Sequence, residues 1–266
     1  MRAACVVLFT LVLAACGSSS SSSLEDAADA TSAETSRVEF AQRVSFPDGV
    51  KEYAFTSTGL YDYRGGRAVM TTSDHVPFFG EGVELREIRL IGDTAYWRWI
   101  VNGKPYWVKQ SPVRKSGDPV ELLFPGPGTP TKPTDVLKLV LDASSGNEVL
   151  GKEDVRGEET THYRARVNVE ELMKRVPAGE RPPAGTVERF GGPVIPVDIW
   201  IDGDSRLRKI VMSRSEPAMT VTAELYDYGV EVDVQPPEGE LISEAKFSEL
   251  TGDFGLVAEE SGEGGS

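Results

Sequence analysis

Two histidines, His75 and His162, are the only imidazole groups available for acid–base chemistry. His75 directly follows Ser73 and Asp74, and three adjacent residues cannot form a serine–histidine–aspartate relay because neighbouring side chains diverge. His162 lies in a segment that alternates like a β-strand, where a histidine is more often structural than catalytic. The sequence contains no HExxH, GxSxG or P-loop motif. We therefore expect no catalytic residue and a protein that is not an enzyme.

Two short motifs could suggest a metal or a cofactor. Asp202-Gly203-Asp204-Ser205 resembles the start of a calcium-binding loop, but its fifth position is Arg206 and the distant Glu is absent, so a hairpin turn is the better interpretation. Gly126-Pro127-Gly128 lacks the third glycine of a phosphate-binding loop. The 42 acidic residues are spread along the chain, as on a solvated surface. We expect no metal site and no cofactor.

Cys16 has the sequence context of a lipid attachment site. The apolar run from Ala3 to Ala15 is too short to span a membrane as a helix and has the character of a signal peptide. It ends Leu13-Ala14-Ala15-Cys16-Gly17, which matches the lipobox of bacterial lipoprotein signals, where the thiol becomes linked to diacylglycerol. We expect removal of residues 1–15 and a lipid anchor on Cys16 at the extracellular face of the cell membrane. The alternative is an ordinary secretion signal with a chance cysteine.

The charge of the chain limits its partners. Its 28 basic and 42 acidic residues give a formal net charge of −14. So acidic a surface disfavours nucleic acid as a partner. Anionic headgroups also repel it, so membrane contact is expected through the lipid on Cys16 instead of through the protein surface.

Composition divides the chain into four parts. Residues 1–15 are the signal peptide, and residues 16–35 hold the lipidated cysteine and a serine-rich flexible tether, in which the stretch after Leu24 could form a short helix. Residues 36–250 are expected to form one domain. Residues 251–266, rich in Gly, Glu and Ser, are expected to be a disordered acidic tail.

Alternating apolar and polar residues predict strands over most of residues 36–250. The clearest hairpin has Asn102-Gly103, a type I′ turn sequence, between Ala95–Val101 and Tyr106–Val108. A slip in the alternation near Arg86-Glu87 predicts a bulge. The remaining expected strands are Val38–Phe46, Tyr53–Phe55, Ala68–Met70, Val83–Leu90, Glu148–Val155, Thr160–Val167, Ile195–Ile201, Leu207–Met212, Met219–Leu225 and Val230–Val234.

Two helices are expected within this strand-rich region. Thr134–Leu141 is apolar on more than one side and should be buried, whereas Val169–Arg175 is charged. Pro177–Pro196, rich in Pro and Gly, is expected to be a long loop. Many antiparallel strands with few helices predict an α+β fold, in which a large curved sheet carries its helices on one side.

Several stretches are similar to the actinobacterial LppX/LprG-type lipoproteins, and with the lipobox and serine tether the likeness extends over residues 36–240. The resemblance implies a LolA-like half-barrel, a curved antiparallel sheet wrapped around a central helix with an apolar cavity between them. Members of that family bind acylated lipids or glycolipids and help to move them across the envelope, and members of the wider group act as periplasmic sensors. The stretches are Val149-Leu150-Gly151-Lys152-Glu153, Thr161-His162-Tyr163, Val197-Asp198-Ile199-Trp200-Ile201-Asp202-Gly203 and Leu225-Tyr226-Asp227-Tyr228-Gly229-Val230.

Alternation also suggests which residues would line such a cavity. The alternative is that the same residues fill a closed core, because alternation shows which side chains share a face but not whether the space between faces is filled. Pro177–Pro196 is either an entrance flap or a surface insertion. The candidate wall is Phe40, Tyr53, Phe55, Met70, Trp97, Trp99, Leu137, Leu141, Val197 and Ile199.

Two functional hypotheses follow. The first is a membrane-anchored envelope lipoprotein that binds lipid or lipoglycan acyl chains in an apolar cavity and carries them across the cell envelope. The second is a non-catalytic interaction or sensor lipoprotein with a filled core that regulates a membrane protein. The expected partners are the membrane, a lipid or lipoglycan, and a membrane transporter or other envelope protein.

Overall fold

The computed structural model describes residues 20–45, 52–72, 82–110, 123–125, 129, 131–175, 187, 192–215 and 218–252. The predicted signal peptide, Cys16 and most of the predicted tail lie outside these residues. The helices are α1 (Ser20–Ser32), α3 (Pro133–Ala143), α4 (Val169–Met173) and α6 (Glu244–Thr251). The strands are β1 (Thr35–Ser45), β2 (Tyr53–Asp62), β3 (Arg67–Thr72), β4 (Val83–Ile91), β5 (Thr94–Val101), β6 (Lys104–Gln110), β7 (Ser144–Val155), β8 (Glu158–Asn168), β9 (Val194–Asp202), β10 (Leu207–Ser215), β11 (Ala218–Tyr226) and β12 (Leu241–Ile242).

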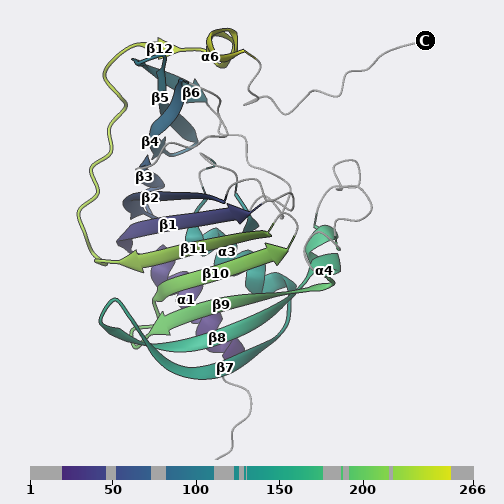
Figure 1. The fold of residues 1–266 in the computed structure, drawn as a ribbon. Helices are drawn as coiled ribbons and strands as arrows, with labels where there is room; N and C mark the ends of the chain where they lie inside the picture. The colour runs from purple at the N-terminus through teal and green to yellow at the C-terminus, as the bar shows by residue number, and fades with distance from the viewer. Residues whose placement is uncertain are drawn as a thin grey trace, which may run out of the picture.

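The strands form one large open sheet in the order β12-β6-β5-β4-β3-β2-β1-β11-β10-β9-β8-β7 (Figure 1). The pairing of β12 with β6 is parallel, and the other pairings are antiparallel. The sheet does not close, because β7 and β12 form its two ends. The predicted large antiparallel sheet with a few helices is confirmed.

One turn and one bulge lie where the sequence predicts them. Asn102 and Gly103 join β5 to β6 with φ angles of 50° and 79°, the left-handed conformation that a type I′ turn requires. The pairing of β4 with β5 shifts register between Leu85 and Glu87, where a bulge was predicted. These features depend on residues close together in sequence, which is why alternation and turn chemistry could predict them.

Helices α1 and α3 pack against each other on the same face of the sheet (Figure 1). The predicted buried helix is confirmed as α3, which begins with Pro133 at its first turn and buries Val136, Leu137 and Val140. Helix α1 buries Leu24, Ala27 and Ala28 at the i, i+3 and i+4 spacing of one helical face. Together the two helices form the inner side of the core over β7 to β10.

The folded part of the chain therefore begins before residue 36, where the domain was expected to start. The predicted flexible tether is helical from Ser20 onward. Thr31 near the end of α1 is fully buried, and its Oγ1 accepts a hydrogen bond of 2.9 Å from the main-chain N–H of Leu207 in β10. The short helix that the sequence allows after Leu24 is present, and α1 begins four residues earlier, at Ser20.

The chain after β11 also departs from the prediction. Val230–Val234 forms no strand, because β10 and β1 already occupy both edges of β11. Instead the segment runs along the outside of the sheet to β12, which pairs with β6 (Figure 1). Helix α6 follows and places the ring of Phe247 at 4.9 Å from that of Trp99. The folded region thus extends to Thr251, one residue beyond the expected end of the domain.

The predicted helix at Val169–Arg175 is present as the shorter α4, which begins where the side chain of Asn168 accepts a hydrogen bond from the N–H of Glu171. Most of the predicted Pro177–Pro196 loop lies outside the described residues, and its last three residues belong to β9. Within the ranges that the structure covers, no helix is long and apolar enough to cross a membrane.

Candidate functional site: an apolar pocket on the inner face of the sheet

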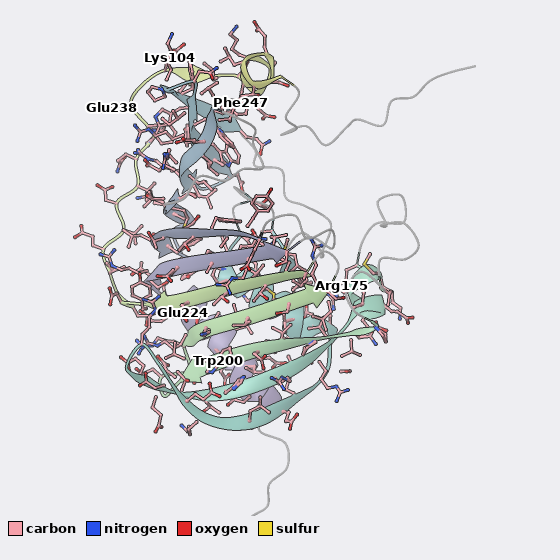
Figure 2. The ribbon with its side chains drawn as sticks, in the orientation of Figure 1. Lys104, Arg175, Trp200, Glu224, Glu238 and Phe247 are labelled. Carbon is pink, nitrogen blue, oxygen red and sulfur yellow. The ribbon has the colours of Figure 1, made fainter. Side chains whose placement is uncertain are left out.

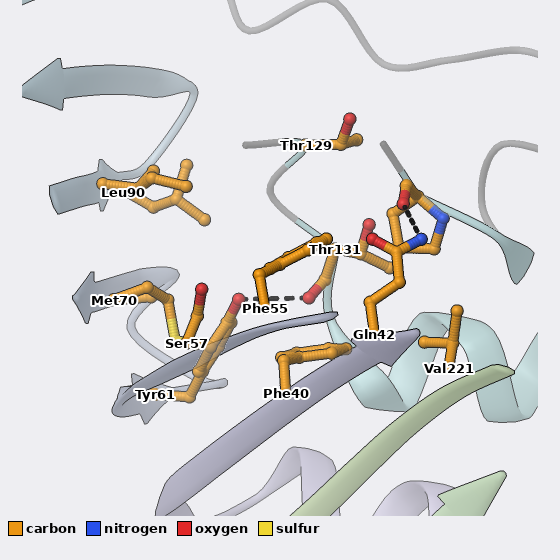
Figure 3. Close-up of a pocket in the computed structure, with 13 residues that line it drawn as sticks. Phe40, Gln42, Phe55, Ser57, Tyr61, Met70, Leu90, Thr129, Thr131 and Val221 are labelled. Atoms are coloured by element: carbon orange, nitrogen blue, oxygen red, sulfur yellow. Dashed lines mark hydrogen bonds between the residues drawn. The ribbon is translucent and has the colours of Figure 1, made fainter. Parts of the chain in front are cut away.

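A mostly apolar pocket lies between the sheet and the segment that precedes α3 (Figure 3). Its sheet side is formed by β1, β2, β3, β4 and β11. The pocket is therefore assembled from parts of the chain that are far apart in sequence. The lining residues are Phe40, Gln42, Phe55, Ser57, Tyr61, Ala68, Met70, Ile88, Leu90, Pro125, Thr129, Thr131 and Val221.

Strand register explains why these apolar side chains meet. Residues directly opposite each other in paired strands point to the same face of the sheet. Phe40 of β1 is paired with Ser57 of β2, and Met70 of β3 is paired with Ile88 of β4. The inner face is therefore continuous from Phe40 to Ile88.

Gly59 makes room for one of these side chains. A Cβ atom at this position would lie 2.5 Å from Sδ of Met70 and 2.0 Å from the main-chain oxygen of Val69. Both contacts are shorter than van der Waals distances allow, so only glycine fits here beside β3. The absence of a side chain at Gly59 lets the Met70 side chain lie against β2.

The segment that precedes α3 is fastened to the sheet by two hydrogen bonds. Nε2 of Gln42 donates to the main-chain oxygen of Pro125 at 3.0 Å, and the hydroxyl of Tyr61 donates to the main-chain oxygen of Thr131 at 3.0 Å. Burial raises the pKa of Tyr61 well above its usual value, and the charge of Asp135 raises it further, so the hydroxyl stays protonated and remains a donor. These two bonds hold the segment before α3 against β1 and β2.

The hydroxyl of Thr131, in this segment, is buried. Its side chain is only 4% exposed, and Oγ1 has no hydrogen-bond partner among the protein groups that the structure describes. Figure 3 shows Gln42, Thr129 and Thr131 on one side of the pocket, and Met70, Leu90 and Ser57 on the other. The pocket thus has mostly apolar walls with a few polar groups among them.

Three residues of the wall predicted from the sequence, Phe40, Phe55 and Met70, line this pocket. Tyr53 is half-buried on β2, and Leu141 is partly buried against the core, and neither of them lines it. The other five, which also lie outside the pocket, are at most 6% exposed and belong to the closed core: Trp97, Trp99, Leu137, Val197 and Ile199.

The packing of helices explains this division. Helices α1 and α3 cover the inner face of β7 to β10, and the ring of Phe247 covers Trp99 on β5. Alternation could have identified Ile88, Leu90 and Val221, which lie on predicted strands. No signal in the sequence pointed to the polar residues Gln42 and Thr131, because their role depends on how the segment before α3 folds back on the sheet.

His162 lies on the opposite, outer face of the sheet, the face that bears Trp200 and Glu224 in Figure 2. Its Nδ1 is 2.8 Å from Oε1 of Glu153, its Nε2 is 3.0 Å from Oδ1 of Asp198, and its ring stacks on Trp200 at 4.1 Å. Hydrogen bonds from Trp200 and then from His162 lower the pKa of Glu153. Each ring nitrogen is thus occupied by a neighbouring side chain, as in a structural histidine.

Asp202 forms a hairpin turn, as predicted from its sequence. Its Oδ1 accepts hydrogen bonds from the main-chain N–H groups of Asp204 and Arg206, and its Oδ2 accepts one of 2.6 Å from Nε of Arg208. Burial opposes ionisation of Asp202, but the hydrogen bonds from Arg206 and Arg208 outweigh it and hold the pKa of this carboxyl below its usual value. Within the described residues, no group of three His, Cys, Asp or Glu side chains is placed to hold a metal.

Comparison with known proteins finds similarity in structure alone. No family model matches the chain, and no curated protein sequence matches it. The chain is similar to LprF from Mycobacterium bovis, with 17% identity, a TM-score of 0.48, and 82% of this chain and 97% of that chain covered.

Two further solved structures extend the comparison. Lipoprotein LppX from Mycobacterium tuberculosis has 13% identity and a TM-score of 0.45, with 81% of this chain and 97% of that chain covered. A LolA superfamily protein from Nitrosomonas europaea has 11% identity and a TM-score of 0.32, with 80% and 94% covered. LppX is one of the two lipoproteins for which the resembled LppX/LprG type is named.

Proposed function

We propose that this protein is a membrane-anchored envelope lipoprotein that binds an acyl chain of a lipid or lipoglycan and carries it across the cell envelope. The observation that carries the proposal is the mostly apolar pocket between the sheet and the segment before α3. Pockets for small ligands commonly have mostly apolar walls. The sequence resemblance to LppX/LprG-type lipoproteins implies the same class of ligand.

Binding would need no chemical step. Each CH₂ group that leaves water for an apolar pocket contributes about 0.8 kcal/mol. Phe40, Phe55, Met70 and Leu90 provide the apolar surface against which such a chain would lie. The protein would thus act as a carrier, not as an enzyme, and without a cofactor.

The N-terminus would supply the attachment to the membrane. A lipid on Cys16 would hold the protein at the extracellular face of the cell membrane, four residues before the start of α1. The net charge of −14 would keep the folded domain off anionic headgroups. A membrane transporter or another envelope protein would be its partner in transfer.

Native mass spectrometry of residues 17–266 purified from an actinobacterial host tests the proposal. This span includes every described element, and the expected result is a non-covalent adduct identified as an acylated lipid. Ser57→Phe should abolish the adduct, because Ser57 lines the pocket and a phenyl ring there would occupy it. Thr58→Phe is the matched control, since Thr58 is exposed and its side chain points to the other face of β2.

The two variants separate the outcomes. Retention of the lipid by Ser57→Phe would place the ligand elsewhere, and loss from both variants would point to a general disturbance of β2. If the wild-type protein carries no lipid and takes none up from vesicles, the carrier function is wrong.

The anchor has its own test. Cys16→Ala in the full-length precursor should move the protein from the membrane fraction to the culture medium. A variant that stays in the membrane fraction would contradict lipid attachment at Cys16.

The second candidate function is that of an interaction or sensor lipoprotein. Strand β7 favours this second function, because the strand lies at one end of the sheet and exposes Val149 and Leu150. A free strand edge with apolar side chains can pair with an extended segment of another protein. A lipid-free wild-type protein that captures the periplasmic part of a membrane protein, and loses it on Val149→Lys, would support this function instead.

A further inference from the structure

We propose that a polar groove at one end of the sheet, separate from the apolar pocket, binds the phosphate group of a phosphate monoester through Arg208. The groove has a volume of about 530 Å³ and lies where the β7–β8 turn, the β9–β10 turn and the chain after β11 meet (Figure 1). It shares no lining residue with the apolar pocket, so this site is independent of the proposed function. The groove lining includes three arginines, Arg156, Arg206 and Arg208, beside Glu158 and Tyr228.

Arg208 is a buried arginine whose terminal nitrogens remain available to a ligand. Its side chain is 7% exposed, and among the described residues it forms one hydrogen bond, of 2.6 Å from Nε to Oδ2 of Asp202. Its Nη2 is 3.8 Å from Oε1 of Glu158, which is beyond hydrogen-bond distance. Neither Nη1 nor Nη2 is fully enclosed, so both can be reached from the groove. The guanidinium therefore offers the planar fork of N–H donors that fits two oxygens of one phosphate.

The buried charges at this site do not balance. Nε of Arg206 and Nε of Arg208 both contact Oδ2 of Asp202, at 3.1 and 2.6 Å. Two largely buried cations thus share one buried carboxylate. The other carboxylates near these arginines belong to Asp204 and Glu158, whose side chains are mostly exposed and therefore screened by water. A buried charge without full compensation is costly, and an anion in the groove would supply the missing counter-charge.

A second arginine favours a phosphate over a carboxylate. The guanidinium groups of Arg206 and Arg208 lie 4.9 and 5.1 Å from the ring centre of Tyr228. Nε and Nη2 of Arg206 bind Asp202 and Asp204, and its Nη1 forms no hydrogen bond with a described residue. A carboxylate has two oxygens, which one guanidinium fork occupies, whereas a phosphate monoester has three unesterified oxygens. The third oxygen can then accept a hydrogen bond from Nη1 of Arg206.

Glu158 is the group that an incoming phosphate would displace. It is the first residue of β8, and its long contact with Arg208 is the only ion pair that its side chain forms with a described residue. The carboxylate can therefore turn into solvent without losing a hydrogen bond. Arg156, on the other side of the turn, already pairs with Glu39 and Glu224 at 2.9 and 2.7 Å, so it adds no uncompensated charge.

Titration calorimetry of residues 17–266 with glycerol 1-phosphate, at constant ionic strength, tests the inference. Glycerol lacks the phosphate, and acetate carries a carboxylate in its place. We expect saturable binding of glycerol 1-phosphate, about ten-fold tighter than that of acetate, the gain from one further charge-assisted hydrogen bond. Glycerol should not bind. Equal affinities for glycerol 1-phosphate and acetate would indicate general attraction of anions and overturn the proposal.

Glu158→Gln tests whether the phosphate takes the place of this carboxylate. The variant should bind glycerol 1-phosphate about three-fold more tightly, because a competing exposed ion pair at Arg208 is removed. Glu159→Gln is the matched control, with the same change in net charge on an adjacent exposed residue that pairs with Lys152 and does not line the groove. Its affinity should stay close to that of the wild type. Equal effects of the two variants would contradict contact of the ligand with Arg208.

Arg208→Lys identifies the donor. A lysine retains the positive charge beside Asp202 but lacks the planar fork, so binding of glycerol 1-phosphate should weaken about ten-fold. Arg166→Lys is the matched control, since Arg166 is exposed on β8 outside the groove. Unchanged affinity in a folded Arg208→Lys overturns the assignment. If circular dichroism shows that Arg208→Lys does not fold, the comparison of Glu158→Gln with Glu159→Gln decides it.

Vesicle co-sedimentation separates two sources of the phosphate. Phosphatidylcholine vesicles are used with and without phosphatidic acid, whose headgroup is a phosphate monoester. We expect binding of the soluble ester alone, because the net charge of −14 repels an anionic bilayer. Sedimentation that requires both phosphatidic acid and Arg208 would assign the same site to a lipid headgroup. If neither glycerol 1-phosphate nor these vesicles bind, the proposal is wrong, and the function proposed for the apolar pocket is unaffected.

Discussion

The hydroxyl of Tyr61 donates a hydrogen bond of 3.0 Å to the main-chain oxygen of Thr131, 70 residues further along the chain. It joins β2 to the segment that leads into α3, and both atoms are buried. The bond therefore positions one end of the pocket relative to the sheet, and its loss should be measurable in stability and in binding.

Tyr61→Phe should lower the free energy of unfolding by about 1–3 kcal/mol, because it leaves the buried carbonyl oxygen of Thr131 without its donor. Urea unfolding monitored by tryptophan fluorescence measures this change. Tyr226→Phe is the control, since the Tyr226 ring is partly exposed and its hydroxyl forms no hydrogen bond with another described residue. Equal losses in the two variants would show that the Tyr61 bond does not fasten the segment.

Alkaline pH should destabilise the protein. Burial raises the pKa of Tyr61, Tyr63 and Tyr228 well above the usual 10.0. The unfolded chain then releases these protons at lower pH than the folded chain, so their contribution is complete below about pH 10 and is lost as the pH rises above it. Urea unfolding at about pH 8 and about pH 11 should show the fall, and Tyr63→Phe should make it smaller. An identical fall in that variant would contradict the assignment for Tyr63.

Asp202→Asn should cost about 3 kcal/mol of unfolding free energy, because it leaves the buried guanidinium of Arg208 with only the longer contact of 3.8 Å to Glu158. The side chains of Asp202 and Arg208 are 4% and 7% exposed. Thermal and urea unfolding measure the loss. Asp204→Asn is the matched control: its carboxylate also pairs with an arginine, Arg206, but is 76% exposed, so less than about 0.5 kcal/mol is expected. Comparable losses would mean that the two ion pairs are equally accessible to water.

Leu24→Ala should destabilise the domain by about 3 kcal/mol, the usual cost of a cavity at a fully buried leucine. This expectation follows from the packing of α1 against α3 and β7. The exposed neighbour Glu25 provides the control Glu25→Ala, which should have little effect. If Leu24→Ala unfolds like the wild type, residues 20–32 do not belong to the cooperative fold.

The sequence by itself determined the features that depend on neighbours along the chain. Alternation showed that Phe40, Phe55 and Met70 share a face, and Asn102-Gly103 specified its turn through the left-handed backbone that these residues tolerate. The long antiparallel sheet, the bulge near Glu87 and the buried helix before β7 were predictable for the same reason.

Only the tertiary structure decided where the sheet is covered and where it encloses a pocket. Alternation gave Val197 and Met70 the same pattern, yet Val197 lies in the closed core over which α1 and α3 pack, whereas Met70 lines the pocket. The sequence allows a short helix after Leu24, but only the fold shows that α1 packs against α3 and the sheet and contributes to this difference. Likewise, nothing local to Gln42 or Thr131 shows that the segment before α3 folds back onto β1 and β2. Burial is a property of what packs against a residue, and those contacts come from parts of the chain that are far away in sequence.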